Sequence, residues 1–218
     1  MNRQGANSKV QTEKEIKKFE RWQKASVPVT RLLSFLVFKD IVDCPTDLVI
    51  PDGTMLVSNH QHRYDPYLIY FHVHNINKKQ KKSFKPIRFP AASVYMRMLF
   101  LGSFLRLFGA YDIGNTKLEK LHGLLLTRAL LREKTTVLLF PEGRRIKKGE
   151  ERGEFEKGVN MILKDEFPVV LVKIEGMNSF SWLNFSLHPQ VKVSFSNIIE
   201  AGLSFEEKIC LANQFFNK

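Results

Sequence analysis

Short apolar runs and longer amphipathic segments alternate along most of this chain. Runs of apolar and β-branched residues predict buried strands at Thr54–Ser58, Thr135–Phe140, Pro168–Gly176 and Val191–Phe195. Apolar residues at helical spacing predict helices at Asp65–His74, Val94–Ala110, Lys117–Glu133, Gly158–Asp165 and Ser204–Phe216. This alternation favours an α/β fold, in which helices cover both faces of a mostly parallel central sheet.

The N-terminal 45 residues have a different pattern. Thr12–Lys24 predicts a solvated helix, and Pro28 begins a second, wider apolar segment, "VTRLLSFLVFKDI". Two interpretations of this second segment remain open: a helix docked on the core, or an interfacial helix whose wide apolar face meets lipid. We therefore divide the chain into an N-terminal region, residues 1–45, and a main domain, residues 46–218.

Charge narrows the range of partners. The 218 residues include 34 Lys and Arg against 22 Asp and Glu, a formal net charge of +12. Such an excess favours an anionic partner, and nucleic acid, an anionic membrane surface and phosphorylated substrates all qualify. The run "NKKQKKSFKPIR" (Asn77–Arg88) is either a solvated loop or part of such a contact.

Targeting signals and cysteine chemistry are sparse. The first residues contain no apolar segment typical of a signal peptide, and no apolar run reaches the ~18 residues that a spanning helix needs. Cys44 and Cys210 are too few for a disulfide framework or a zinc cluster. The sequence predicts a protein that is soluble or lies on a membrane without crossing it.

The stretch "SNHQHRYDPY" concentrates titratable side chains between a predicted strand end and a predicted helix start. Ligands of open α/β sheets bind at this kind of position. His60 can remove a proton from a hydroxyl near neutral pH, and a carboxylate such as Asp65 can orient its ring. The alternative is a purely structural role: Asp65 only caps its helix, with Pro66 at the first helical position, and His60 is a polar loop residue.

A metal site is the other interpretation of the same stretch. "HQH" followed by Asp65 resembles the beginning of a binuclear zinc hydrolase motif, and His72 and His74 would be further ligands. The interval between His62 and Asp65 is one residue too long for that motif. His72 and His74 lie in a predicted helix, where side chains two positions apart diverge. The residues therefore favour acid–base chemistry over metal binding.

A second group of candidate residues follows the strand that ends at Phe140. In "FPEGRR", Gly143 allows close approach of the backbone to a ligand, Glu142 can contact a polar group, and Arg145 can bind phosphate through a planar fork. Lys157, in "GEFEKGV", adds a cation before the next predicted helix. Alone, the first group is also compatible with a charged turn.

The ordered set "NHQHRYD", "LLFPEGRR", "FEKGV" and "FPVVLVKIEG" resembles the glycerolipid acyltransferase superfamily. Its best-known members are the 1-acylglycerol-3-phosphate acyltransferases. The signatures of that family are Asn-His-x4-Asp, then Phe-Pro-Glu-Gly-x-Arg, then an apolar strand that opens with proline. The resemblance extends over roughly Met55 to Phe195.

The resemblance implies roles for individual residues. It makes His60 the catalytic base and Asp65 its partner, and it assigns acceptor binding to Glu142 and Arg145. By extension, we expect the substrate to contact Asn59, Gly143, Lys117 and Lys157 as well. One position departs from the family pattern: Asn115, in "GAYDIGN", stands where an arginine usually ends a glycine-led strand. Because that arginine is thought to hold the phosphate of the acceptor, Lys117 is the expected substitute. Arg144 replaces a small threonine.

The resemblance implies transfer of a fatty acyl group from an acyl-CoA or acyl carrier protein thioester to a lysophospholipid hydroxyl. The most expected acceptor is 1-acylglycerol-3-phosphate, and another lysolipid is the alternative. The expected reaction needs no metal or cofactor, and the expected location is the cytoplasmic side of an anionic membrane. A nucleic-acid-binding protein and an inactive lipid-binding relative remain as competing classes, although neither uses His60, Asp65 and Glu142 together.

Overall fold

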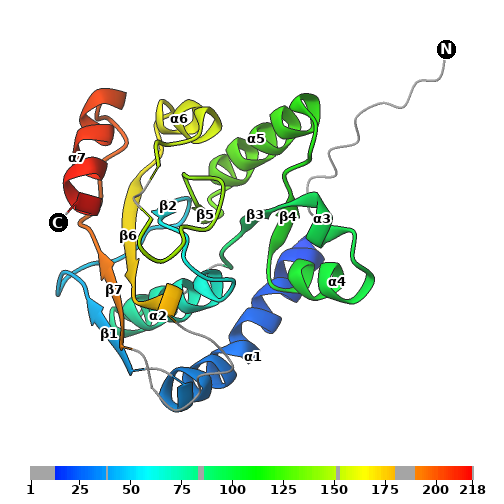
Figure 1. Ribbon diagram of the computed structural model, residues 1–218, viewed down its shortest axis with the longest axis vertical. Coiled ribbons are helices and arrows are strands. Elements are labelled where there is room, and N and C mark those ends of the chain that lie inside the picture. Colours follow the sequence, from blue (N-terminus) through cyan, green and yellow to red (C-terminus); the bar gives the residue numbers. More distant parts are fainter. Residues whose placement is uncertain (1–12, 38, 83–85, 151–152, 180–189, 218) are drawn as a thin grey trace.

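The computed structural model describes residues 13–37, 39–82, 86–150, 153–179 and 190–217. Its centre is a five-stranded sheet (Figure 1). The strands lie in the order β1 (Lys39–Asp43), β7 (Gln190–Phe195), β6 (Val169–Glu175), β2 (Met55–Ser58) and β5 (Val137–Leu139). All neighbouring pairs are parallel except β6 with β7. The predicted mostly parallel α/β sheet is confirmed.

A second, two-stranded sheet extends the first. β3 (Phe89–Ala91) and β4 (Ala110–Asp112) are parallel to each other, and the parallel bridge between Arg88 and Val137 joins them to β5. The side chain of Arg88 is buried and donates a hydrogen bond to the carbonyl of Gly109 at 2.7 Å. As a result β2, β5, β3 and β4 run in one direction, and their carboxyl ends share one edge.

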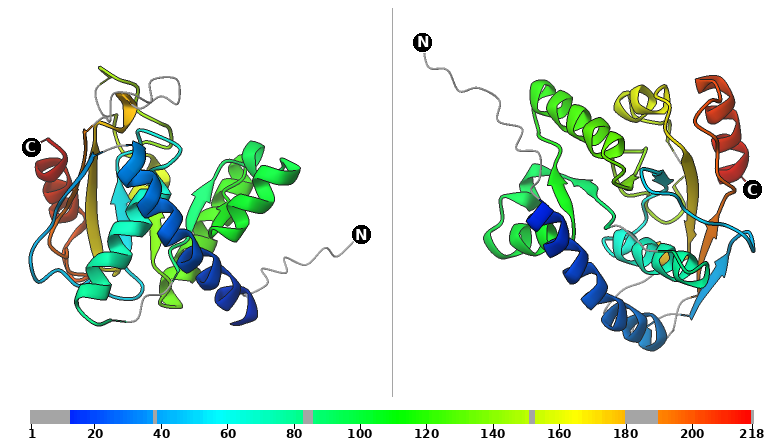
Figure 2. Two further views of the ribbon diagram at one scale, coloured as in Figure 1. Left: turned by 90° about the horizontal axis from the view of Figure 1, so that it is seen from below. Right: turned by 180° about the vertical axis from the view of Figure 1, so that it is seen from behind.

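Helices cover both faces of the central sheet, as the two core clusters show (Figures 1 and 2). On one face, alternate residues of β6 such as Val170 and Val172 pack with α2 (Asp65–Lys79). On the other face, Val169 and Leu171 share a cluster with residues of three helices. These are α5 (Lys117–Arg132), α6 (Lys157–Leu163) and α7 (Phe205–Asn217). Burial on both faces explains why β2, β5 and β6 read as apolar runs.

The N-terminal region differs from its prediction in two ways. Residues Glu13–Val37 form one helix, α1, that continues through Pro28, and Lys39–Asp43 form the unpredicted edge strand β1. The predicted solvated segment is anchored by Gln23, whose amide bonds the backbone N–H and carbonyl of Ile87 at 3.0 and 2.7 Å. Because β1 pairs with β7, the N-terminal region contributes a strand to the central sheet, and the division at residue 45 stays a prediction.

Two further segments correct the prediction. The expected helix at Val94–Ala110 is two helices, α3 (Ser93–Met96) and α4 (Leu99–Leu107). Gly102 makes the turn between them possible, since a side chain there would lie 2.2 Å from the carbonyl oxygen of Met96. The basic run Asn77–Arg88 begins inside α2, and both of its named ends are buried. Its described exposed lysines are Lys78, Lys79, Lys81 and Lys82.

Candidate active site

The motifs at the ends of β2 and β5 meet at the shared edge of the sheet. His60 Nδ1 lies 2.8 Å from Asp65 Oδ2, so the two residues form the predicted pair. The His60 side chain is 20% exposed, whereas that of Asp65 is fully buried. If the proton of a neutral His60 lies on Nδ1 and is donated to Asp65, Nε2 remains the basic atom, and this is the arrangement of a general base with an orienting carboxylate.

The carboxylate of Asp65 turns back toward the loop instead of capping its helix. The backbone N–H groups of Gln61 and His62 donate to Oδ2 at 2.6 and 2.8 Å. The N-cap residue of α2 is Tyr64, whose side chain forms no capping hydrogen bond. Asp65 is the first helical residue, and Pro66 follows it. The expected capping role of Asp65 is therefore wrong. Three donors converge on one buried oxygen and fix the His60 ring.

The loop after β5 supports His60 from its other side. The His60 ring stacks on Phe140, with ring centroids 4.0 Å apart. The N–H of Ile146 donates to the carbonyl of His60 at 2.6 Å. Neither Phe140 nor Ile146 was predicted as a site residue. An aromatic residue directly before Pro-Glu-Gly was the available signal for Phe140, while the Ile146 contact has no signal in the sequence.

The Pro-Glu-Gly loop holds charged residues at different depths. Glu142 is buried, Gly143 adopts φ +65° against the side chain of Glu156, and Arg145 is exposed. Arg144 is paired with Glu150 at 2.5 Å, and this hydrogen bond is the main cause that lowers the pKa of Glu150 to about 2. Arg144 is thus engaged within its own loop. Among the described residues, Arg145 has no ion-pair partner within 4 Å.

Arg145 and His62 lie close enough to influence each other. Burial lowers the pKa of His62, Asp65 opposes that shift, and the positive charge of Arg145 lowers the pKa further. His62 Nδ1 accepts the N–H of Tyr64 at 3.3 Å, and its ring stacks on Tyr64. A neutral His62 therefore shapes the loop between His60 and Asp65 while leaving the charge of Arg145 at the site.

Asn59 has a clear structural position. Its side-chain amide donates to the carbonyl of Ile174 at 2.8 Å and accepts the N–H of Ile174 at 2.7 Å, which ties the loop after β2 to β6. Gln61 adds a second tie, because its Oε1 accepts the N–H of Met177 at 3.0 Å. The substrate contact predicted for Asn59 stays a prediction, and its observed contacts are to the scaffold.

The two predicted lysines stand at helix starts near this edge. Lys157 begins α6 and is exposed, and the adjacent Glu156 donates its N–H to the carbonyl of Pro141 at 2.7 Å. Lys117 begins α5 and is exposed. Lys157 therefore lies next to a residue that is bonded to the Pro-Glu-Gly loop. Lys117 follows β4, farther along the same edge.

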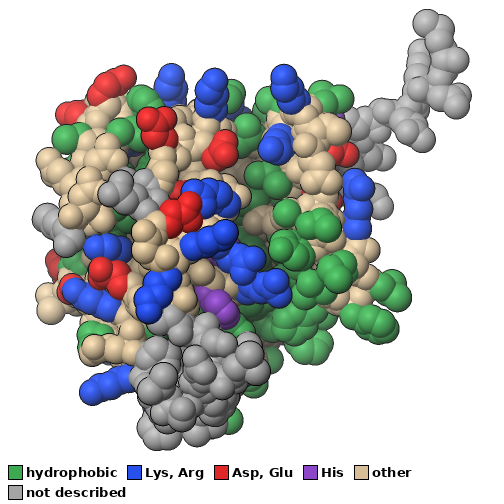
Figure 3. Space-filling view, viewed as in Figure 1, with side chains coloured by type: hydrophobic (Ala, Val, Ile, Leu, Met, Phe, Trp, Pro, Cys, Tyr) green, Lys and Arg blue, Asp and Glu red, His purple; other side chains and the backbone are tan. Residues whose placement is uncertain are grey.

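The surface at this edge combines charge with a broad apolar area. In Figure 3, histidine lies at the boundary between a group of Lys and Arg side chains and a hydrophobic area that extends over the place of α4. The most exposed apolar residues of α4 are Leu99 and Phe100, at 79% and 86%. The arrangement suits a molecule with an anionic head and an apolar tail.

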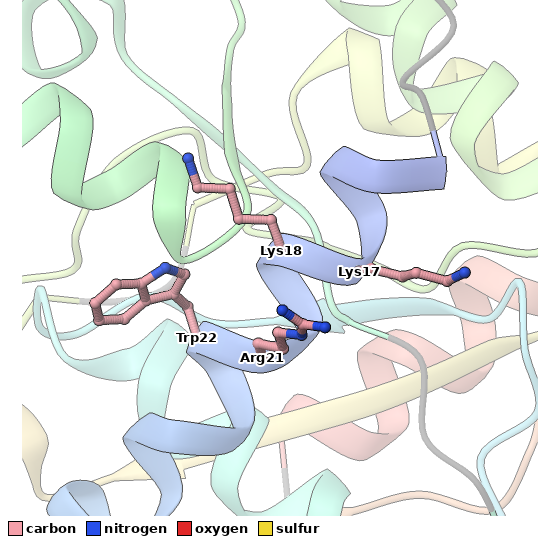
Figure 4. A pocket seen from close by; sticks show the side chains of 4 residues that line it. All are labelled: Lys17, Lys18, Arg21 and Trp22. Atoms are coloured by element: carbon pink, nitrogen blue, oxygen red, sulfur yellow. The ribbon is translucent and has the colours of Figure 1, made fainter.

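A separate hollow of about 360 Å³ lies along α1. It is lined by Lys17, Lys18, Arg21 and Trp22, whose side chains point in different directions (Figure 4). None of these residues belongs to the loops that carry His60 and Glu142. The hollow is therefore not part of the candidate active site.

The histidines of α2 are placed away from the pair. His72 is a buried residue of α2. Its Nε2 lies 3.3 Å from Oδ2 of Asp40 in β1, and burial lowers the pKa of His72 to about 4. Within the described residues, no three His, Cys, Asp or Glu side chains are grouped so that they could hold a metal ion. The described helices also include none with the length and apolarity of a membrane span.

Comparisons with known proteins agree with the motifs and the fold. A family model described as "Acyltransferase" matches residues 45–175. The fold is similar to the crystal structure of the 1-acyl-sn-glycerophosphate (LPA) acyltransferase PlsC from Thermotoga maritima, with a TM-score of 0.66. That match has 17% sequence identity and covers 94% of this chain and 80% of the other. At such identity the likeness shows the fold alone. No curated protein sequence matches this chain significantly.

Proposed function

The chain belongs to the acyltransferase family, and we propose that it transfers a fatty acyl group from a thioester donor to the hydroxyl of a lysophospholipid. The observation that carries this proposal is the His60–Asp65 pair, 2.8 Å apart at the carboxyl end of β2. The expected acceptor is 1-acylglycerol-3-phosphate. The name of the structurally similar Thermotoga maritima protein supports that choice.

The reaction that fits this geometry is direct transfer. His60 Nε2 takes the proton of the acceptor hydroxyl while the oxygen attacks the thioester carbonyl. The new C–O bond forms, the C–S bond breaks, and the departing thiolate receives the proton from the imidazolium. Asp65 stabilises the transient imidazolium and keeps the ring in place. Because a thioester is already activated, no covalent acyl-enzyme, metal or cofactor is proposed.

The basic residues beside the pair fit the anionic groups of both substrates. Arg145 is exposed on the loop that follows Phe140, the residue on which the His60 ring stacks. The planar guanidinium of Arg145 suits a phosphate. We assign acceptor contacts to Glu142, Gly143 and Arg145, with Lys117 and Lys157 as further cations. The carrier of the acyl group, coenzyme A or an acyl carrier protein, is open in this proposal.

The exposed apolar surface supports work at a membrane. Leu99 and Phe100 of α4 and Leu32 of α1 are all more than half exposed. Insertion of such residues into an interface, together with attraction of the net +12 charge to anionic lipid, would hold the enzyme peripherally. We propose that it works at the cytoplasmic side of a membrane.

A second acceptor class has one specific observation in its favour. Asn115, at the end of the segment that follows β4, replaces the cation expected there, so a lysolipid with another head group is the alternative. A nucleic-acid-binding role gives no purpose to the His60–Asp65 pair. An inactive lipid-binding role is disfavoured because the pair is intact and aligned.

Product analysis tests the proposal directly. The purified chain is incubated with isotopically labelled acyl-CoA or acyl carrier protein thioesters and a panel of lysolipids, and the products are identified by mass. The expected result is a diacylated phospholipid with the label in the new ester, formed by the wild type and not by His60→Ala. Nucleic-acid retention with no acyl transfer to any acceptor would refute the proposal.

A further inference from the structure

Arg97 occupies a position that the sequence motifs do not assign. It directly follows α3, and its side chain is 67% exposed with Nη2 3.9 Å from Glu119 Oε1. The other carboxylate oxygen of Glu119 accepts the N–H groups of Asn115 and Thr116 at 2.9 and 3.0 Å. Glu119 thus caps α5 and at the same time holds the Arg97 guanidinium beside Asn115.

The strand directions place Arg97 on the same edge as His60. Arg97 follows β3 and Asn115 follows β4, and both strands run parallel to β5 and β2. One parallel bridge, between Arg88 and Val137, links β3 to β5, so the edge continues from β2 through β5 to β3, and Arg97 follows β3 after the short helix α3.

The neighbours of Arg97 suit an amphiphile. Val94, Met98 and Leu99 are 61%, 53% and 79% exposed on the same pair of helices. The hydrophobic area of Figure 3 has Lys and Arg side chains along its border near the places of α3 and α5. A cation at this border can bind an anionic head while the acyl tail stays on the apolar side.

The nearby carboxylates do not cancel this cation. The charged residues near Arg97 among those described include Arg106, whose Nη2 donates to the carbonyl of Met96 at 2.7 Å, and, on the turn before α5 and its first residues, Asp112, Lys117, Glu119 and Lys120. Asp112 accepts hydrogen bonds from the Ser93 hydroxyl and the Gly114 N–H. Backbone hydrogen bonds lower the pKa of Glu119, so both carboxylates are committed to closing the turn. An exposed pair at 3.9 Å is weak, and most of the guanidinium donors remain available to a ligand.

We propose that Arg97 binds the phosphate of the lysophospholipid acceptor, with Lys117 beside it, and so supplies from α3 the cation that Asn115 lacks. This proposal rests on the proposed function and refines its acceptor site. It makes Arg97 a determinant of head-group specificity and gives it no part in proton transfer.

Steady-state kinetics of Arg97→Ala test the assignment. With 1-acylglycerol-3-phosphate we expect the KM for the acceptor to rise about 5- to 20-fold, the lower part of the range for a charge-assisted bond because the site is exposed. The KM for the thioester and the rate with a monoacylglycerol, which has no phosphate, should stay unchanged. Arg97→Lys should recover only part of the loss, and Asn115→Arg in the Arg97→Ala background should restore binding.

Arg132→Ala is the matched control, since Arg132 is an exposed arginine in the last turn of α5, at the opposite end of that helix. An equal KM increase in Arg132→Ala would overturn the proposal in favour of bulk charge. An equal increase with monoacylglycerol would overturn it in favour of a structural role.

A binding measurement separates the failure of this proposal from the failure of the proposed function. Titration of glycerol 3-phosphate and of 1-acylglycerol-3-phosphate, followed by ³¹P NMR, needs no catalysis. Weaker binding to Arg97→Ala than to the wild type supports the site even if no acyl transfer is found. Equal binding refutes the site even in an active enzyme.

Discussion

The edge of the sheet around His60 and the surface formed by α3 and α4 are built in opposite ways. Around His60, polar side chains are buried and bonded: one oxygen of Asp65 receives three donors, and Asn59 bonds both backbone groups of Ile174. On α4, the side chains of Leu99 and Phe100 stand in solvent. The first region holds the His60 ring in one orientation, as the proposed proton transfer requires, and the second presents an apolar surface to solvent.

The difference suits the amphiphilic acceptor that we propose. Proton transfer needs donors and acceptors that are already aligned, which explains the dense hydrogen bonding at the strand ends. A lipid tail needs only apolar area, which tolerates substitution and motion. Changes in the first region should therefore affect chemistry or folding sharply, whereas changes in the second should affect membrane binding gradually.

The largest effects are expected from His60→Ala and Asp65→Asn. The amide cannot stabilise an imidazolium and favours the wrong ring tautomer, so kcat should fall by about 10⁴-fold, as when the carboxylate that orients a catalytic histidine is neutralised. His60→Ala should abolish transfer. Both are measured as acyl transfer rates, with circular dichroism to confirm the fold. Retention of more than a tenth of the wild-type rate by His60→Ala would contradict the assignment of the base.

The second effect concerns folding. Asn59→Ala leaves the buried N–H and carbonyl of Ile174 without their partner, at a cost of roughly 2–4 kcal/mol in the free energy of unfolding. Thermal or urea unfolding measures this loss, and Asn115→Ala, at an exposed position, is the control. If Asn59→Ala were as stable as the wild type but had a raised acceptor KM, Asn59 would be a substrate contact, as the sequence predicted, and not an anchor.

The sequence predicted the parts of this molecule that a continuous run of residues specifies. β2, β5 and β6 were recognised because burial on both faces leaves apolar runs, β7 by its alternating valine and phenylalanine residues, and α5 by its periodicity. The pairing of His60 with Asp65 was also predicted, because a loop that turns into a helix start can bring residues five positions apart together, and a known family shares their spacing.

Contacts between distant segments were missed for a physical reason. β1 has the exposure pattern of an edge strand, so no apolar run identifies it, and β3 is three residues long with a central proline. The bond from Ile146 N–H to the carbonyl of His60 joins backbone atoms, which carry no side-chain signal. The split of α3 from α4 depends on a glycine whose neighbour, the Met96 carbonyl, is known only once the chain is folded.

The third effect tests the apolar region. Leu99→Ser with Phe100→Ser should weaken binding to anionic vesicles by about 10- to 100-fold, because full burial of each large apolar side chain contributes on the order of 1.5–3 kcal/mol and insertion at an interface buries each side chain only in part. Unfolding should hardly change, since both residues are exposed. Co-sedimentation measures the binding. Leu211→Ser is the control, since α7 lies at the opposite end of the molecule (Figures 1 and 2).

Full recovery of the wild-type protein in the supernatant at low salt, with anionic lipid present, would refute the proposed binding to a membrane. Added salt should also weaken the binding of the wild type, because ions screen exposed charges beyond a Debye length of ~8 Å at physiological ionic strength. A double variant that binds vesicles like the wild type would move the contact to another part of the surface.

The smallest effect is expected at His62, inside the ordered region. Its Nδ1 accepts the N–H of Tyr64, and burial together with Arg145 lowers its pKa, so the ring is neutral near pH 7 and shapes the loop. General acid–base groups contribute ~10²–10⁴-fold, and we expect His62→Ala to reduce kcat by less than ~10-fold. His62→Asn, which keeps a side-chain acceptor near Tyr64, should lose less. Acyl transfer rates of the two variants, with and without a chelator, make the measurement. If His62→Ala and the chelator each inactivated the protein, His60, His62 and Asp65 would be metal ligands, and the contrast between a fixed proton-transfer site and an apolar surface would need a third, metal-binding component.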